Sequence, residues 1–308
     1  MDKEDRALIG MTLTGILLFL IGILTGKALC AQPIIHTNPH KQERTVSMVT
    51  KSGKDYAKNR KHNIVVMGEA KIGKTLFTST APGKLYYFLF DYDGIESIAG
   101  FNSEAMERLD YDEFYPGTGE FNDMMQPWNN AERKMADLTR ECPYDVVILD
   151  SLTSMQDTLW SWCLGKMQIK LGDLERIGKG KGGQLDHYSH LGSRGQAFVT
   201  NFLKLPCHRI ITAHDQWDKD ELTGVLKYKV AGRGKMLPDW FSTFKDFSCL
   251  FKMERVNVGG NKSYKVRTNG GTGLNCGTRW QGLSDLEDPN LYAMMKKAGV
   301  NGTEAKNV

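Results

Sequence analysis

The sequence predicts an α/β fold in which a mainly parallel sheet carries helices on both faces. A C-terminal β-hairpin and an N-terminal transmembrane helix are expected in addition. Three observations predict this organisation. Short apolar runs that end in polar residues recur along the chain and are typical of strands buried on both faces. A glycine-rich turn follows the first of these runs, and Ala7 to Gly26 is a run of twenty residues without a charged side chain.

Composition places the chain among ordinary globular proteins. Its 308 residues are 41% hydrophobic and 25% charged, which excludes wholesale disorder, collagen-like repeats and a small disulfide-stapled fold. The six cysteines show no CxxC pair and no Cys/His spacing typical of zinc. We therefore expect the folded part of the protein to be intracellular, with its cysteines reduced. Residues 33–62 hold seven Lys and Arg against two acidic residues, while the whole chain carries only +4. The basic charge is therefore local, which disfavours a nucleic-acid coat protein.

The uncharged run predicts a single-pass transmembrane anchor over residues 1–27. Twenty helical residues at about 1.5 Å each span the ~30 Å hydrocarbon core of a bilayer. Lys and Arg are in excess after the run, in a basic linker over residues 28–61. Because cytoplasmic flanks of membrane helices carry this excess, the folded domain after the linker is expected in the cytoplasm. Three alternatives stay open: a cleaved signal peptide, a buried core helix, and a start at Met48, which would give a cytoplasmic protein.

The first buried strand is expected at Ile64 to Met67, and the segment after it satisfies G-x-x-x-x-G-K-[ST] in full. A helix is expected at Leu76 to Thr80. Glycines in such a P-loop let successive backbone N–H groups surround phosphate oxygens, and the helix N-terminus adds positive potential. We expect Lys74 to reach the β and γ phosphates and Thr75 to hold Mg²⁺. The predicted nucleotide-binding residues are Gly68, Glu69, Ala70, Lys71, Ile72, Gly73, Lys74, Thr75 and Leu76.

Two further apolar runs, Leu85 to Phe90 and Tyr144 to Asp150, end in carboxylates. Because the carboxyl ends of parallel strands meet at one edge of a sheet, these acids are expected beside the P-loop. Asp150 is predicted to hold Mg²⁺ through water. Asp93 is predicted to orient the attacking water. The alternative is that Asp150 caps the following helix and that Asp91 and Asp93 cap a turn.

A fourth strand is expected at His208 to Ala213, and His214 follows it directly. A polar side chain at this place can contact the γ-phosphate and report its hydrolysis, so we predict that role for His214, with a purely structural donor as the alternative. Cys249 to Val256 and Lys262 to Thr268 are expected to pair as a hairpin that closes the sheet. Residues 283–308 are expected to form a short helix and a mobile tail.

The order of these motifs along the chain, P-loop, Asp91 to Asp93, Asp150 and then His214, resembles the RecA-like branch of the P-loop ATPases, in the AAA group. More narrowly, it is similar to the phage-encoded nucleotide-binding proteins of that branch. The resemblance covers about residues 62–256 and implies a RecA-like ATPase domain over residues 62–282. It implies ATP and Mg²⁺ as ligands and Asp93, Lys74 and His214 as catalytic residues. The family more often has glutamate at the position of Asp93.

The same resemblance implies single-stranded DNA as a partner. The family binds it through two mobile loops, whose matching intervals are Gly172 to Gly195 and Asp215 to Lys235. The first interval contains the basic, glycine-rich segment Arg176 to Gly183, which suits a phosphate backbone or serves only as a solvated linker. Cations of the second interval would reach the ATP of a neighbouring copy in a homo-oligomer, or they face solvent.

The sequence thus predicts a Mg²⁺-dependent ATPase of the phage DNA recombination or replication type that acts with single-stranded DNA. It is expected to be a single-pass membrane protein whose ATPase domain lies in the host cytoplasm. An alternative of a different class is a membrane-attached nucleotide-dependent switch or scaffold whose partner is a protein. The membrane anchor favours this second interpretation. A small-molecule kinase is disfavoured because no arginine-rich lid follows Asp150.

Overall fold

The computed structural model describes residues 60–117, 119–169, 183–219, 224, 226–232, 245–258, 260–271 and 276–300. All of them belong to one compact unit, Lys51–Val308. The predicted anchor at Ala7 to Gly26 lies outside the described residues, as do the linker up to residue 59 and the tail from residue 301. Within the described ranges, no helix is both long enough and apolar enough to cross a bilayer.

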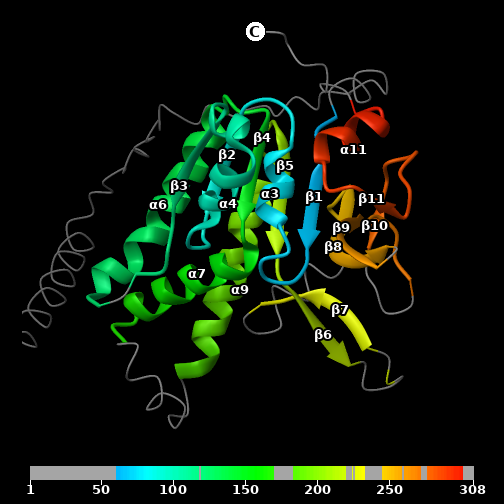
Figure 1. Cartoon of the computed structure of the whole chain (residues 1–308). Helices are drawn as coiled ribbons and strands as arrows, with labels where there is room; N and C mark the ends of the chain where they lie inside the picture. The colour runs from blue at the N-terminus through cyan, green and yellow to red at the C-terminus, as the bar shows by residue number, and fades with distance from the viewer. Residues whose placement is uncertain are drawn as a thin grey trace, which may run out of the picture. The chain divides into compact units, whose positions relative to one another are not determined.

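The described elements alternate between strands and helices over much of the chain (Figure 1). In chain order they are β1 (Asn63–Met67), α3 (Lys74–Ser79), β2 (Leu85–Leu89), α4 (Gly94–Phe101), α5 (Ser103–Met106), β3 (Leu109–Glu113), α6 (Phe121–Arg140), β4 (Val146–Asp150), α7 (Leu152–Lys166), α9 (Gly183–Phe202), β5 (His208–Ala213), β6 (Asp215–Lys219), β7 (Leu226–Val230), β8 (Cys249–Val258), β9 (Asn261–Arg267), β10 (Gly277–Thr278), β11 (Leu286–Glu287) and α11 (Leu291–Lys297).

The main sheet has the strand order β11-β9-β8-β1-β5-β4-β2-β3. The six strands from β8 to β3 in this order are parallel to their neighbours, whereas β9, β10 and β11 pair antiparallel. One strand, β5, therefore separates the strand before the P-loop from the strand that ends in Asp150. This mainly parallel sheet fits the RecA-like P-loop core that the sequence predicts.

The central strands are buried on both faces, and this explains their unbroken apolar runs. Val65 and Met67 of β1 belong to one hydrophobic cluster, with residues of α6, α7 and α9, whereas Ile64 and Val66 belong to a second, with residues of α3, α4 and α11. Successive side chains of a strand point to opposite faces, so both clusters draw on the same strands. Helices consequently cover both faces of the sheet, as predicted.

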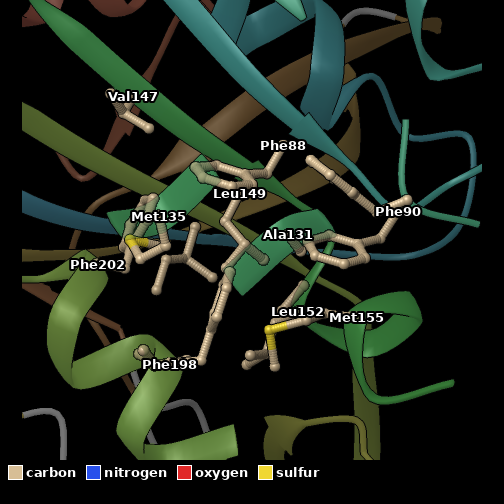
Figure 2. Packing of buried hydrophobic residues seen from close by; sticks show 14 of the residues in the cluster. Phe88, Phe90, Ala131, Met135, Val147, Leu149, Leu152, Met155, Phe198 and Phe202 are labelled. Atoms are coloured by element: carbon tan, nitrogen blue, oxygen red, sulfur yellow. The ribbon is translucent and has the colours of Figure 1, made fainter. Parts of the chain in front are cut away.

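Aromatic side chains fill the first of these clusters. Figure 2 shows Phe88 of β2 and Leu149 of β4 lying against Phe198 and Phe202 of α9. The rings of Phe88 and Phe198 meet edge to face at a centroid distance of 5.9 Å, which is an arrangement that aromatic pairs prefer. Burying one such ring stabilises the fold by roughly 1.5 to 3 kcal/mol. This cluster thus covers one face of the sheet that carries the candidate site.

The sequence predictions for the strands are confirmed at β1, β2, β4 and β5 and at the β8–β9 hairpin. The first helix begins earlier than predicted, at Lys74 rather than Leu76. The edge strand β3 was not predicted, because only Leu109 of its five residues is buried and its pattern is polar. The interval Asp215 to Lys235 is not simply a loop, because β6 and β7 form an antiparallel hairpin within it.

Candidate nucleotide-binding site

The P-loop leads from the end of β1 to the start of α3. Gly73 has φ +94° and Lys71 has φ 60°, both in the left-handed region that favours glycine. Gly68 is required for a different reason, because a Cβ at this residue would lie 2.9 Å from the Met253 carbonyl oxygen of β8. The turn therefore fits closely against the neighbouring strand, with Gly73 and the start of α3 at the carboxyl edge of the sheet.

Lys74 lies inside this turn with its side chain largely buried. Its Nζ donates hydrogen bonds to the carbonyl oxygens of Gly68, at 2.9 Å, and Glu69, at 2.7 Å. Burial lowers the pKa of Lys74, and the carboxylates of Asp150 and Asp91 oppose this shift. An anion held by the loop would give the ammonium a charge-assisted partner stronger than these neutral carbonyls. The position thus fits a phosphate group.

Thr75 and Asp150 meet directly at the foot of the P-loop. The Thr75 hydroxyl donates to Asp150 Oδ2 at 2.6 Å, and the Thr212 hydroxyl of β5 donates to the other carboxylate oxygen. Asp150 is 1% exposed. Its pKa is raised, mainly by burial and next by Asp91, while the two hydroxyls and Lys74 act in the opposite direction. A buried carboxylate beside a hydroxyl supplies the oxygen ligands that Mg²⁺ prefers.

Among the described residues, no group of three or more His, Cys, Asp and Glu side chains could hold a metal ion by itself. Mg²⁺ usually keeps several waters and takes one or two protein oxygens together with substrate phosphates. The Thr75 and Asp150 pair meets that requirement. The donor set therefore fits a magnesium ion that arrives with a nucleotide, not one held permanently by a protein cage.

Asp150 is not the cap of the helix that follows it. Ser151 is the N-cap of α7, and its hydroxyl oxygen accepts a hydrogen bond from the Ser154 backbone N–H at 3.3 Å. The peptide bond between Asp150 and Ser151 is cis. The carboxylate of Asp150 instead accepts hydrogen bonds from Thr75 and Thr212, and its role toward the metal stays a prediction.

His214 follows β5 and lies next to the P-loop lysine. Its Nδ1 is 3.3 Å from Lys74 Nζ, and its backbone N–H donates to the Thr153 hydroxyl at 3.1 Å. Burial lowers the pKa of His214, and the charge of Lys74 lowers it further. A neutral imidazole at pH 7 is thus favoured, with Nδ1 accepting from Lys74. Both groups stand where they can respond to a phosphate.

Asp91 and Asp93 occupy different places after β2. Asp91 is partly buried, accepts a hydrogen bond from the Ser154 hydroxyl and acts electrostatically on Lys74, Asp150 and His214. Asp93 is exposed, has φ 59° and is the N-cap residue of α4. The role of Asp93 toward water stays a prediction. The structure adds Asp91 as an acid in contact with the site.

Sequence reasoning therefore found Lys74, Thr75, Asp150 and His214, and it placed Asp91 at the same edge of the sheet without giving it a role of its own. It missed Ser154 and Thr212. Thr212 carries a signal that the sequence does show, because it is a polar residue between the apolar residues Ile211 and Ala213 near the end of β5. Ser154 carries none, since a serine in the first turn of a helix is common.

The β6–β7 hairpin begins directly after His214 and lies beyond the carboxyl ends of β1 and β5 (Figure 1). The Ala231 backbone N–H donates to the His214 carbonyl at 2.8 Å, which joins the end of the hairpin to its start. Next to it, Asp215 lies 3.3 Å from Lys252 of β8 in a buried ion pair. The Lys252 ammonium also lies over the Tyr228 ring, 3.0 Å from its centroid. The base of the hairpin is thus connected to the site.

Comparison with known proteins gives one family. The AAA domain family matches residues 60–248. Among solved structures, the flagellar accessory protein FlaH from Methanocaldococcus jannaschii is similar, with 14% identity, a TM-score of 0.32, and coverage of 67% of this chain and 76% of that chain. A search of curated proteins finds no match. Because the family match spans more than half of the chain, from the strand before the P-loop to His214 and the hairpin beyond it, the chain belongs to the AAA domain family.

Proposed function

We propose that the chain is a Mg²⁺-dependent ATPase that binds ATP at residues 68–76. The observation that carries this proposal is a pair of contacts made by adjacent residues of the P-loop, Lys74 with His214 and Thr75 with Asp150, which join three separate parts of the sequence. ATP rather than GTP is proposed because no Asn-Lys-x-Asp guanine-reading motif occurs at a matching place. Membership of the AAA domain family supports the same activity.

Each residue of the site has a separate task in this reaction. Lys74 binds the β and γ phosphates, and the backbone N–H groups from Gly68 to Leu76 surround their oxygens. Thr75 and Asp150 hold Mg²⁺, which, when bound, neutralises charge on the phosphate oxygens. Asp91 or Asp93 orients the attacking water, and neutral His214 senses the γ-phosphate from beside Lys74.

Asp150→Asn tests this division of tasks. The substitution keeps the acceptor for Thr75 and leaves the backbone cradle intact, so we expect ATP affinity to change less than tenfold. Turnover should fall by about 100-fold or more, because the ligand that holds the metal has lost its charge. Asp145→Asn, at the exposed residue immediately before β4, is the matched control and should keep normal rates. An unchanged Mg²⁺ dependence of the rate in Asp150→Asn would remove Asp150 from the metal site.

We further propose that the ATPase acts with single-stranded DNA, as a phage recombination or replication protein does. The β6–β7 hairpin supports this proposal. Trp217 is 57% exposed on it and lies against Tyr228 of the facing strand, with a ring centroid distance of 3.4 Å. Exposed aromatic rings stack on unpaired bases regardless of sequence. The hairpin starts at Asp215, which is bonded directly to His214. Binding of single-stranded DNA to the hairpin would therefore change the position of His214.

Salt dependence of DNA binding separates the two predicted contact regions. Replacing Lys179 and Lys181, which lie outside the described residues, should flatten the log-log slope by about one to two units, at roughly 0.7 per neutralised phosphate. Trp217→Ala should instead weaken binding at every salt concentration by about 5-fold to 150-fold, since stacking contributes about 1 to 3 kcal/mol per base. Phe101→Ala, which removes another exposed ring, is the control. Unaltered affinity and slope in both variants would exclude this surface.

The alternative function is a membrane-attached nucleotide-dependent switch or scaffold for a protein partner. The uncharged run from Ala7 to Gly26 favours it. Full-length protein should then sediment with membranes and resist carbonate extraction, and Leu18→Lys should release it, because a central charge costs roughly 2.5 to 3.5 kcal/mol on insertion scales.

An ATPase rate that does not respond to single-stranded DNA would favour this alternative. A rate per molecule that rises with protein concentration would indicate a homo-oligomer.

A further inference from the structure

The β6–β7 hairpin stands apart from the main sheet. Of the strands that the structure describes, β6 and β7 pair only with each other and form a separate two-stranded sheet. This small sheet lies beyond the carboxyl ends of β1 and β5 (Figure 1). Because a two-stranded hairpin is marginally stable by itself in water, its position depends on the contacts made at its base. Those contacts therefore decide where the hairpin stands relative to the nucleotide site.

Lys252 of β8 makes two of these contacts. Its Nζ lies 3.3 Å from Asp215 Oδ2, at the first residue of β6, and 3.0 Å from the centroid of the Tyr228 ring of β7. The side chains of Lys252 and Asp215 are only 8% and 3% exposed. Within the described part of the chain, Asp215 Oδ2 has no hydrogen-bond partner, so the Lys252 charge offsets its burial. One ammonium group thus connects both strands of the hairpin to the main sheet.

Lys252 also lies beside the start of the P-loop. It is paired with Met67, the last residue of β1. The next residue of β8, Met253, lies against Gly68, where a Cβ would come within 2.9 Å of the Met253 carbonyl oxygen. The strand that presents Lys252 to the hairpin is therefore the strand against which the P-loop packs.

Asp215 extends the contact in the other direction, toward His214. The two residues are adjacent in the chain, and His214 Nδ1 lies 3.3 Å from Lys74 Nζ. Burial and then Lys74 lower the pKa of His214. Asp91 and Asp215 oppose this shift. Without Lys252, the charge of Asp215 would be buried and uncompensated, and its attraction for Lys74 and His214 would increase.

Trp217 is the exposed end of this chain of contacts. Its ring is 57% exposed and lies against the Tyr228 ring, with a centroid distance of 3.4 Å. Tyr228 in turn carries the Lys252 ammonium over its ring. A buried ion pair adds little stability compared with apolar side chains of similar volume. The Lys252 and Asp215 pair is therefore better explained by the position that it gives the hairpin than by the stability that it gives the fold.

We propose that Lys252 is a positioning residue for the ATPase reaction. It holds His214 in place through Asp215, and it passes a displacement of His214 on to the hairpin, where the surroundings of Trp217 change. The γ-phosphate causes the displacement, because a phosphate oxygen competes with His214 for the Lys74 ammonium. This role rests on the proposed nucleotide binding, but it does not require single-stranded DNA.

Acrylamide quenching of Trp217 fluorescence in the full-length protein tests this role. The chain has six tryptophans, so the Trp217 signal is taken as the difference between each protein and its Trp217→Phe form. We expect Mg²⁺ with a non-hydrolysable ATP analogue to change the quenching constant of the wild type by about twofold or more. Lys252→Met should bind the analogue within about threefold of the wild type, yet give no Trp217 response. Lys262→Met, at an exposed position of β9, is the matched control and should respond as the wild type.

Asp215→Asn combined with Lys252→Met decides the question if the single variant does not fold. The double variant buries no unpaired charge, so it should fold and still lack the Trp217 response. Its ATP turnover should fall by about tenfold at a nearly unchanged KM, because the P-loop stays intact while His214 loses its position.

The outcomes separate this role from the proposed function. A wild-type protein that does not bind the analogue in calorimetry would refute both. Binding by the wild type without a Trp217 response would overturn the role of Lys252 alone. A full Trp217 response in folded Lys252→Met, or in the double variant, would overturn it as well.

Discussion

Asp91 and Asp93 are two residues apart in the sequence, yet they have different surroundings. Asp91 accepts a hydrogen bond from Ser154 and acts on the charges of Lys74 and Asp150. Asp93 begins α4 from an exposed position. Its neighbour Gly94 would bring a Cβ within 3.8 Å of Asp150 Oδ2, so the start of α4 lies close to the metal-binding acid. Either carboxylate is near enough to the site for a comparison to be informative.

The pair Asp91→Asn and Asp93→Asn distinguishes the two acids. Each substitution removes a charge and preserves the size of the side chain, so the two variants are controls for one another. We expect Asp91→Asn to lower the ATP turnover by at least about tenfold, because a positioned acid or base contributes about 10² to 10⁴ to a rate. Asp93→Asn should stay within about threefold of the wild type. Single-turnover kinetics measures both, and the reverse order would assign the role to Asp93.

At the level of residues, the P-loop is predictable because the residues that would bind phosphate follow one another directly in the sequence. Asp150 and His214 are predictable for a different reason, since each directly ends an apolar run. The contacts of Asp91 with Ser154 and of Thr212 with Asp150 join residues more than sixty positions apart. No local pattern indicates those contacts, and only the packing of the strands produces them.

At the level of elements, β1 and β5 are held together at their amino ends by two histidines. His62 and His208 stack with a ring centroid distance of 5.6 Å, and Trp280 donates from its indole N–H to His62 Nδ1 at 3.1 Å. Both histidines are 5% exposed. Burial and then neighbouring cations lower the pKa of His62 to about 4 and that of His208 to about 3. Both rings are therefore neutral in the folded state at pH 7.

This pair predicts a loss of stability in mild acid. The ordinary pKa of 6.5 applies in the unfolded chain, so as the pH falls below 6.5 the unfolded state binds protons first. Each histidine should lower the free energy of unfolding by up to about 2 kcal/mol between pH 7 and pH 5. Urea unfolding at the two pH values measures the effect, and His208→Gln should reduce it. His190→Gln, at an exposed position of α9, is the control; an equal reduction by both variants would refute the assignment.

The order of the strands in the whole sheet is not predictable from the sequence. Strands β1, β2 and β4 show apolar runs, and β5 is buried along its whole length like β2 and β4, so the patterns do not indicate which strands are neighbours. The structure places β5 between β1 and β4. That order brings Thr212, which belongs to β5, and His214, which directly follows β5, between the P-loop and Asp150. The predicted α/β class with a mainly parallel sheet is confirmed, whereas the predicted transmembrane helix lies outside the described residues, and the detailed geometry of the site depends on the strand order.

Across the whole molecule, the central claim is that the carboxyl edge of the sheet binds Mg·ATP through Lys74. Calorimetric titration of full-length protein with Mg·ATP, compared with Lys74→Ala, tests it most directly. Lys71→Ala is the matched control, because Lys71 lies in the same loop but is exposed. We expect Lys74→Ala to bind at least about 100-fold more weakly, since a buried charge-assisted contact is lost, with an unchanged circular dichroism spectrum, and Lys71→Ala to bind within about fivefold of the wild type. Binding of Mg·ATP by folded Lys74→Ala with wild-type affinity would contradict the claim.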